Sequence, residues 1–183
     1  MKTLISICLL FGFTTIYAQS YEVNTNNSSF SWTGKAAFSS YALTGEIKVK
    51  KGIVVIDEDQ ISKLIILMDM KSLNHKNSDL KGHLRSEDFF EVSTYKTAKF
   101  ELKEVSRIEN NKAKLKGELT IKDKTRVETF IINIDNNQSK ITLDIVIDRT
   151  AYDVKFNSPS FFKKLKENAI ADEFVLKGEI LLK

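Results

Sequence analysis

The amino-acid sequence predicts an all-β protein, an antiparallel barrel of eight strands with short helical segments closing its ends. The clearest observation is a period of two. In residues 42–50, Leu43, Ile47 and Val49 share one face with Gly45, and polar side chains share the other. This alternation is typical of strands with one buried and one wetted face, and therefore of an antiparallel sheet. The second observation is that short links separate eight or nine such segments, which favours a barrel or a sandwich.

The expected strands follow one another along the chain with few interruptions. Most are apolar at alternate positions, and short polar clusters that favour turns stand between several of them. The strand segments are residues 28–32, 42–50, 52–56, 61–70, 98–105, 113–122, 125–134, 140–148 and 174–182. The turn signals are Lys51-Gly52, Asp57-Glu58-Asp59, Asn110-Asn111, Lys122-Asp123-Lys124 and Asn136-Asn137.

Two segments interrupt this rhythm. Residues 71–95 are polar and rich in turn-forming side chains. Residues 157–171 contain the single proline of the chain, directly after Ser158. Serine is a good N-cap and proline suits the first helical position, so a short helix is expected there, with two phenylalanines on one side and lysines on the other.

Length and composition indicate one domain, residues 19–183, behind a signal peptide, residues 1–18. Lys2 and an apolar run precede Ala18, near which cleavage is expected, so we expect a periplasmic or secreted protein. The lone cysteine, Cys8, lies in the leader, which excludes disulfides, cysteine zinc sites and thiol catalysis from the rest. The net charge of +4 comes from interspersed charges, which indicate a solvated surface and no nucleic-acid partner.

Three glycines lie on the apolar face in the middle of expected strands: Gly45, Gly117 and Gly178. Glycine there packs nothing and usually marks a bend or the close approach of another group. One interpretation is that these glycines allow the strand coiling that closes the barrel. The other is that they leave room for a ligand, since an eight-stranded barrel is just wide enough to hold a small one.

Residues 83–90 read HLRSEDFF and admit a catalytic and a structural interpretation. His83 and Asp88 could form an acid–base pair of a small-lipid hydrolase or isomerase, but the chain has no nucleophile elbow. A metal site would need carboxylates to join the two histidines, and the spacing is not that of a zinc motif. We therefore favour a latch in which Arg85 pairs with a carboxylate, short turns are capped, and Phe89 and Phe90 enter the barrel mouth.

Several motifs in this order resemble the YceI-like family, exported bacterial lipid-binding proteins with a lipocalin-like barrel. The similar stretches are SFSWTGK (29–35), LTGEI (43–47), GHLRSEDFFEV (82–92), Tyr95 with AKF (98–100), KGELTIKDKT (116–125), IDRTAY (147–152), SFFKK (160–164) and ADEF (171–174). The resemblance implies an extended eight-stranded barrel whose long apolar interior holds an isoprenoid or another lipid chain.

We therefore expect a lipid-binding protein that is not an enzyme and needs no cofactor or metal. It would hold an isoprenoid or acyl chain for transport, storage or protection. The alternative is an envelope interaction protein with a filled core. Transient contact with a membrane surface and a homodimer formed through an open strand edge are also considered. The expected wall residues are Trp32, Phe38, Leu43, Ile47, Phe100, Leu102, Leu119, Ile145 and Phe174, and the expected closures are Phe89, Phe90, Phe161 and Phe162.

Overall fold

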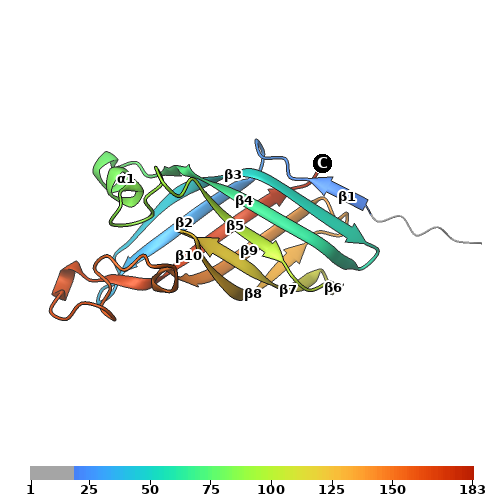
Figure 1. Ribbon diagram of the computed structural model, residues 1–183. Coiled ribbons are helices and arrows are strands. Elements are labelled where there is room, and N and C mark those ends of the chain that lie inside the picture. The colour runs from blue at the N-terminus through green and yellow to red at the C-terminus, as the bar shows by residue number, and fades with distance from the viewer. Residues whose placement is uncertain (1–18) are drawn as a thin grey trace, which may run out of the picture.

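The computed structural model describes residues 19–183, which form a closed antiparallel β-barrel (Figure 1). The expected signal peptide, residues 1–18, lies outside the described residues. The predicted all-β, lipocalin-like architecture is confirmed. In the described part of the chain, no helix is long and apolar enough to span a membrane.

Eight strands make up the ring, and each pairs with its neighbours in antiparallel fashion. The ring closes where β10 pairs with β2, which joins residues far apart in the sequence, such as Phe30 and Gly178. The strands in ring order are β2 (Ser29–Ala36), β3 (Ala42–Asp57), β4 (Gln60–Asn74), β5 (Thr97–Leu102), β7 (Lys112–Ile121), β8 (Lys124–Ile134), β9 (Lys140–Asp148) and β10 (Ile170–Leu181).

Two further short strands extend the ring at the end opposite the α-helix (Figure 1). β1 (Gln19–Glu22) pairs with the last residues of β3, and backbone hydrogen bonds join Glu22 to Lys183 beyond β10. β6 (Ser106–Glu109) lies between β4 and β7 beyond the end of β5. The predicted strand over residues 98–105 therefore ends at Leu102, and β1 and β6 were not predicted.

The expected turn at Lys51-Gly52 is wrong, because both residues lie inside β3. The pairing of β3 with β4 shifts register between Val49 and Lys51, as a β-bulge does. Lys50 and Lys51 are both exposed, and the buried positions resume at Gly52. Because of the extra residue, the buried positions change from odd numbers (45, 47 and 49) to even numbers (52, 54 and 56) within one continuous strand. The sequence pattern of this strand therefore resembles that of two short strands.

β8 and β9 are joined along only part of their length. Their ladder consists of Ile132 with Leu143, Asn133 with Thr142, and Ile134 with Ile141, after which the two strands separate. The short 3₁₀ helix η1 (Arg149–Tyr152) follows β9 and fills the space. The Tyr152 hydroxyl, which is fully buried, donates a hydrogen bond of 2.7 Å to Glu128 of β8. The gap in the ladder is thus closed by a side chain.

Aromatic rings occupy the space over the three mid-strand glycines. A Cβ atom on Gly45 would lie 2.4 Å from the Trp32 ring, and one on Gly178 would lie 2.4 Å from the Phe30 ring. A Cβ on Gly117 would lie 2.7 Å from the ring of Phe100. These glycines therefore accept rings from neighbouring strands, and their space is not room for a ligand. Phe100 also packs on Phe130, with 5.3 Å between ring centroids, in the solid part of the core.

The helices lie at one end of the barrel. α1 (Ser78–Arg85) begins after Asn77, whose side chain accepts hydrogen bonds from the backbone N–H groups of Asp79 and Leu80. The helix expected within residues 157–171 is largely wrong, because only the short 3₁₀ helix η2 (Lys166–Asn168) forms. Lys164 and Lys166 have positive φ angles of 76° and 48°, which no α-helix contains.

Candidate functional site

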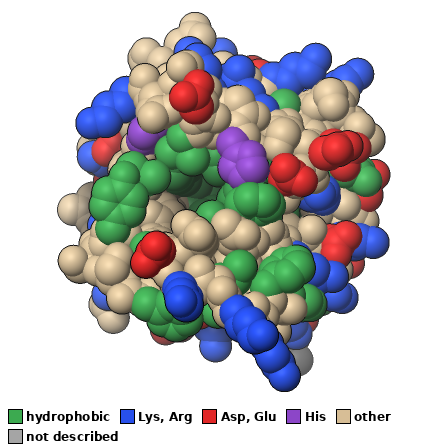
Figure 2. Space-filling view, turned by 90° about the vertical axis from the view of Figure 1, so that its left-hand side faces the viewer, with side chains coloured by type: hydrophobic (Ala, Val, Ile, Leu, Met, Phe, Trp, Pro, Cys, Tyr) green, Lys and Arg blue, Asp and Glu red, His purple; other side chains and the backbone are tan. Residues whose placement is uncertain are grey.

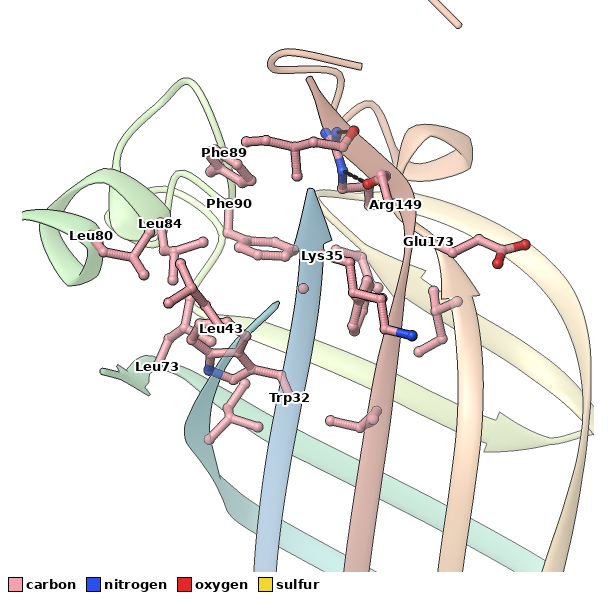
Figure 3. A pocket seen from close by; sticks show the side chains of 18 of the residues that line it. Trp32, Lys35, Leu43, Leu73, Leu80, Leu84, Phe89, Phe90, Arg149 and Glu173 are labelled. Carbon is pink, nitrogen blue, oxygen red and sulfur yellow. Dashed lines mark hydrogen bonds between the residues drawn. The ribbon is translucent and has the colours of Figure 1, made fainter. Parts of the chain in front are cut away.

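A cavity of about 300 Å³ opens at the barrel end that carries α1. Figure 2 looks into this end and shows a hollow lined by hydrophobic side chains. Inward residues of seven strands form the wall, and Leu80 and Leu84 of α1 cover one side (Figure 3). Residues 167–171 form another part of the mouth. The cavity does not follow the whole barrel axis, since side chains meet at the opposite end.

The structure brings seven of the expected site residues together around this cavity. Trp32, Leu43, Ile47, Leu119 and Phe174 line it from the strands, and the expected closures Phe89 and Phe90 line it from the loop after α1. Phe89 is 4% exposed. Whether these side chains contact a ligand stays a prediction.

The other six expected residues do not line the cavity. Phe100, Leu102 and Ile145 are partly buried and pack against the solid core. Phe38, Phe161 and Phe162 are outside the barrel interior, where they are 71%, 53% and 50% exposed. Phe161 and Phe162 lie in the irregular segment where a helix was expected, so the helical face that would have directed them inward does not exist.

Several lining residues were not predicted. Met68, Ile121, Ile147 and Leu176 are inward-facing members of predicted strands, so the alternating pattern contained the signal that could have found them. Leu80 and Leu84 are four residues apart, which places them on one face of α1. Gly34 lines the cavity too, and a Cβ there would have no heavy atom within 4 Å.

The segment from α1 to Phe90 covers the mouth. Arg85 Nε donates a hydrogen bond of 2.8 Å to the carbonyl oxygen of Leu73, which anchors the helix to β4. Arg85 was expected to form an ion pair with a carboxylate, but it donates this hydrogen bond to the backbone instead. The Ser86 hydroxyl donates to the His83 carbonyl oxygen at 2.8 Å. The His83 ring packs edge-on against Phe89 and Phe156, with centroids 5.2 and 4.5 Å away.

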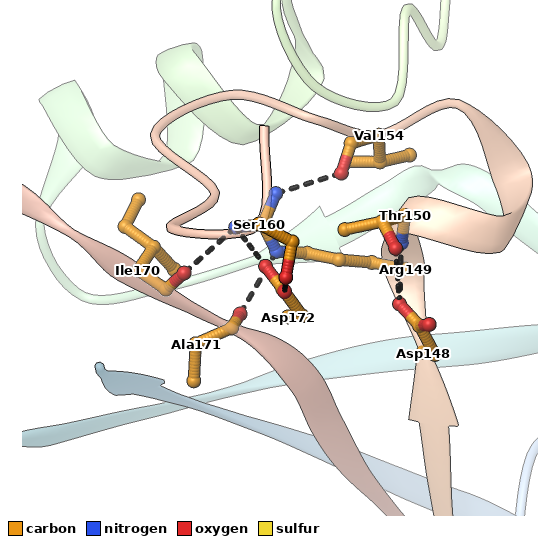
Figure 4. A network of polar contacts seen from close by, with 8 residues as sticks. All are labelled: Asp148, Arg149, Thr150, Val154, Ser160, Ile170, Ala171 and Asp172. Atoms are coloured by element: carbon orange, nitrogen blue, oxygen red, sulfur yellow. Dashed lines mark hydrogen bonds and ion pairs between the residues drawn. The ribbon is translucent and has the colours of Figure 1, made fainter. Parts of the chain in front are cut away.

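Arg149 is a buried cation in the cavity wall that sequence patterns did not indicate (Figure 4). Its guanidinium donates hydrogen bonds to the carbonyl oxygens of Val154, Ile170 and Ala171, at 2.7 to 3.0 Å. Asp172 lies 4.0 Å away. Burial lowers the pKa of Arg149, and Asp172 and Asp148 oppose that shift. An arginine stays protonated in such a place, so its charge is used to hold η1, β10 and the intervening segment together.

Apart from the buried Arg149, the charged residues that line the cavity are exposed at its rim. Lys35 and Glu173 contribute to the lining but are exposed, and Figure 3 shows their charged ends directed away from Leu80 and Leu84. Among the described residues, His83 and Asp88 form no hydrogen bond with each other, and no group of three or more His, Asp or Glu side chains could hold a metal ion. The described part of the chain therefore does not assemble the expected pair of His83 and Asp88, and the hollow is lined mainly by apolar side chains.

A closed eight-stranded barrel with an apolar hollow at one end defines the class of small barrels with an internal cavity. The comparisons then identify the family, because the model of the YceI-like domain matches residues 21–181. The chain belongs to the YceI-like family.

Curated relatives include an UPF0312 protein of Vibrio cholerae, 28% identical over 121 residues, which are 64% of this chain and 63% of the relative. The match thus spans less than two thirds of that protein. An UPF0312 protein of Staphylococcus epidermidis is 34% identical over 95 residues, 47% of this chain and 53% of the relative.

Solved structures share the fold. BcnA of Burkholderia cenocepacia has a TM-score of 0.69 and 20% identity, with 88% of this chain and 99% of that chain covered. A polyisoprenoid binding domain from Saccharophagus degradans, implicated in plant cell wall breakdown, has a TM-score of 0.66 and 13% identity, with 89% and 97% covered. A Campylobacter jejuni YCEI protein has a TM-score of 0.59 and 18% identity, with 100% and 99% covered.

Proposed function

We propose that this protein binds the apolar chain of one lipid in the cavity at the barrel mouth and carries out no reaction on it. The observation that carries the proposal is the apolar hollow beneath α1, Phe89 and Phe90. The likeness of the fold to a polyisoprenoid binding domain supports a lipid as the ligand, either isoprenoid or acyl.

Burial of hydrocarbon is sufficient to hold such a ligand. Removing roughly 300 Å² of apolar surface from water at about 25 cal/mol per Å² contributes roughly 7 kcal/mol before the costs of ordering. No specific polar contact deep in the barrel is required. The exposed charges of Lys35 and Glu173 at the rim suit a polar head group that stays in water.

Transport, storage or protection of the lipid would take place in the periplasm or outside the cell, after residues 1–18 have been removed near Ala18. The test of ligand and location starts from protein recovered from the periplasmic extract of its own cells. Solvent extraction and mass spectrometry should then find a bound lipid. A mature chain that begins at Gln19 supports the location, and a lipid-free extract together with failure to take up added lipid contradicts the function.

A variant that fills the cavity tests the site directly. Gly34→Phe should place a ring in the hollow, because Gly34 lines the cavity and a Cβ there meets nothing within 4 Å. We expect binding of a fluorescent long-chain fatty acid or a short polyprenol to weaken by at least about tenfold, since buried area is lost. Gly82→Phe is the matched control, because Gly82 is equally free of neighbours but lies exposed on α1. Equal binding by both variants would place the ligand elsewhere.

A further inference from the structure

The large hydrophobic side chains exposed to solvent separate by type. Those on the barrel wall and in the β5–β6 connection are aliphatic, namely Val105, Val127, Ile131 and Val146. The four aromatic ones are Phe38, Tyr41, Phe161 and Phe162, and they lie in segments at the end where the cavity opens. We call these four residues the aromatic rim. Aliphatic residues scattered singly need no explanation, but a cluster of exposed aromatic rings around an opening does.

The two segments that carry the aromatic rim are joined to each other and to the cavity. The Ala37 backbone N–H donates a hydrogen bond of 2.8 Å to the Ala169 carbonyl oxygen, which links the β2–β3 turn to the end of the irregular segment. Tyr41 and residues 167–171 also line the cavity. The aromatic rim is therefore continuous with the mouth.

Cations accompany the rings. Lys163, Lys164 and Lys166 are exposed beside Phe161 and Phe162, with Glu167 as the one acid of residues 160–168. Lys155 Nζ lies 4.8 Å from the centre of the Phe161 ring. Phenylalanines next to lysines are the combination that binds the interface of an anionic bilayer, where rings enter the headgroup boundary and cations contact lipid charges. Figure 1 shows this segment extending beyond the end of the barrel, where a flat surface can reach it.

We propose that the aromatic rim and Lys163, Lys164 and Lys166 dock the barrel, mouth first, on the surface of an anionic phospholipid bilayer. This inference rests on the proposed function, because docking would bring the cavity onto the membrane and let an apolar chain pass between them without crossing water. The occupant of this surface is thus the lipid bilayer itself, and not a second protein.

Flotation of the mature protein with vesicles tests the docking. Vesicles of phosphatidylcholine mixed with phosphatidylglycerol should bind the protein, and vesicles of phosphatidylcholine alone should bind it less. F161S/F162S should weaken binding by about tenfold or more, because two rings leave the interface. The matched control is V127S/I131S, which removes side chains 64% and 60% exposed from the barrel wall and should leave binding unchanged.

The charge contribution has its own variant. K163Q/K164Q/K166Q should weaken binding to anionic vesicles by about fivefold for each lysine. K48Q/K50Q/K51Q, which removes three exposed lysines from β3, is the control. High salt should reduce the difference between the two triple variants, because it screens exposed charges.

Solution binding of a fluorescent fatty acid separates the two proposals. If F161S/F162S binds the fatty acid like the native protein but fails to float, both proposals stand. If the native protein binds the fatty acid yet does not float with anionic vesicles, the docking proposal is overturned. The aromatic rim would then be a contact surface for a protein partner. If it floats but binds no apolar chain, the cavity function fails and docking survives.

Discussion

At the residue scale, the inward-facing glycines differ in what lies over them. Gly178 is covered by the Phe30 ring, and Gly45 by the Trp32 ring. Gly34 faces the open cavity with no atom within 4 Å of a Cβ position. The sequence marks Gly45 and Gly178 as inward, whereas Gly34 lies beyond the predicted strand 28–32. No pattern shows which glycine has a ring over it, because that ring comes from another strand whose register is set by the whole barrel.

The same change at two glycines should therefore have opposite effects on stability. Gly178→Ala should lower the free energy of unfolding by about 1–3 kcal/mol, because a methyl group cannot fit 2.4 Å from the Phe30 ring. Gly34→Ala should leave the free energy of unfolding unchanged or raise it by up to about 1 kcal/mol, because the unfolded chain loses conformational entropy and the added methyl group clashes with nothing. Urea unfolding of both variants checks this. A loss of stability in Gly34→Ala equal to that in Gly178→Ala would contradict the assignment of the cavity.

At the element scale, alternation predicted the strands well and the connections poorly. The turn predicted at Lys51-Gly52 is a bulge in β3, because a bulge and a turn both interrupt the alternation of apolar and polar residues. The segment after Pro159 was read as a helix because Ser158 and Pro159 suit a helix start, yet the buried Ser158 hydroxyl caps nothing. Its backbone is set instead by contacts distant in sequence, such as the Ile170 N–H to the Asn157 carbonyl oxygen at 2.9 Å.

The contact between η1 and β8 should make the protein sensitive to alkali. Burial, and then the hydrogen bond to Glu128, raise the pKa of Tyr152 far above its usual value. Because the pKa of Tyr152 is raised in the folded state, the stability contributed by its protonated, buried hydroxyl is fully present below a pH of about 10, the usual tyrosine pKa. It is lost progressively as the pH rises from there toward the folded pKa.

Urea midpoints measured from neutral to strongly alkaline pH test this sensitivity. The midpoint of the native protein should fall more steeply above about pH 10 than that of Tyr152→Phe, which has no hydroxyl proton to lose. Tyr41→Phe, at a ring that is 63% exposed, serves as the control and should follow the native protein. Parallel curves for all three proteins would show that Tyr152 does not govern the effect.

At the scale of the whole molecule, the barrel is hollow at one end and solid at the other. The family resemblance implied a long apolar interior, but the cavity stops at about 300 Å³, and rings such as Phe100 and Phe130 pack in the solid core beside it. Periodicity shows which side chains point inward. It does not show whether they meet, since that depends on the diameter and taper of the closed ring.

In a homologous series of fatty acids, the binding affinity should therefore stop increasing beyond a certain chain length. Affinity should increase by about 0.8 kcal/mol for each added CH₂ group while the chain still enters the cavity. It should then level off, because further carbon atoms remain in water at the mouth. Calorimetric titration across the series locates the limit. A steady increase through the longest chains would mean that the solid end opens on binding.

The partial ladder between β8 and β9 determines where the girth of the barrel is easiest to change. Their three paired positions all lie at the far end, so the two strands diverge toward the mouth. There the Tyr152 side chain lies between them and its hydrogen bond to Glu128 joins η1 to β8. Widening the barrel at this seam would break the hydrogen bonds of Tyr152 to Glu128 and of Arg126 to Ala151, whereas widening it between β7 and β8 would break a backbone ladder that runs the full length of both strands.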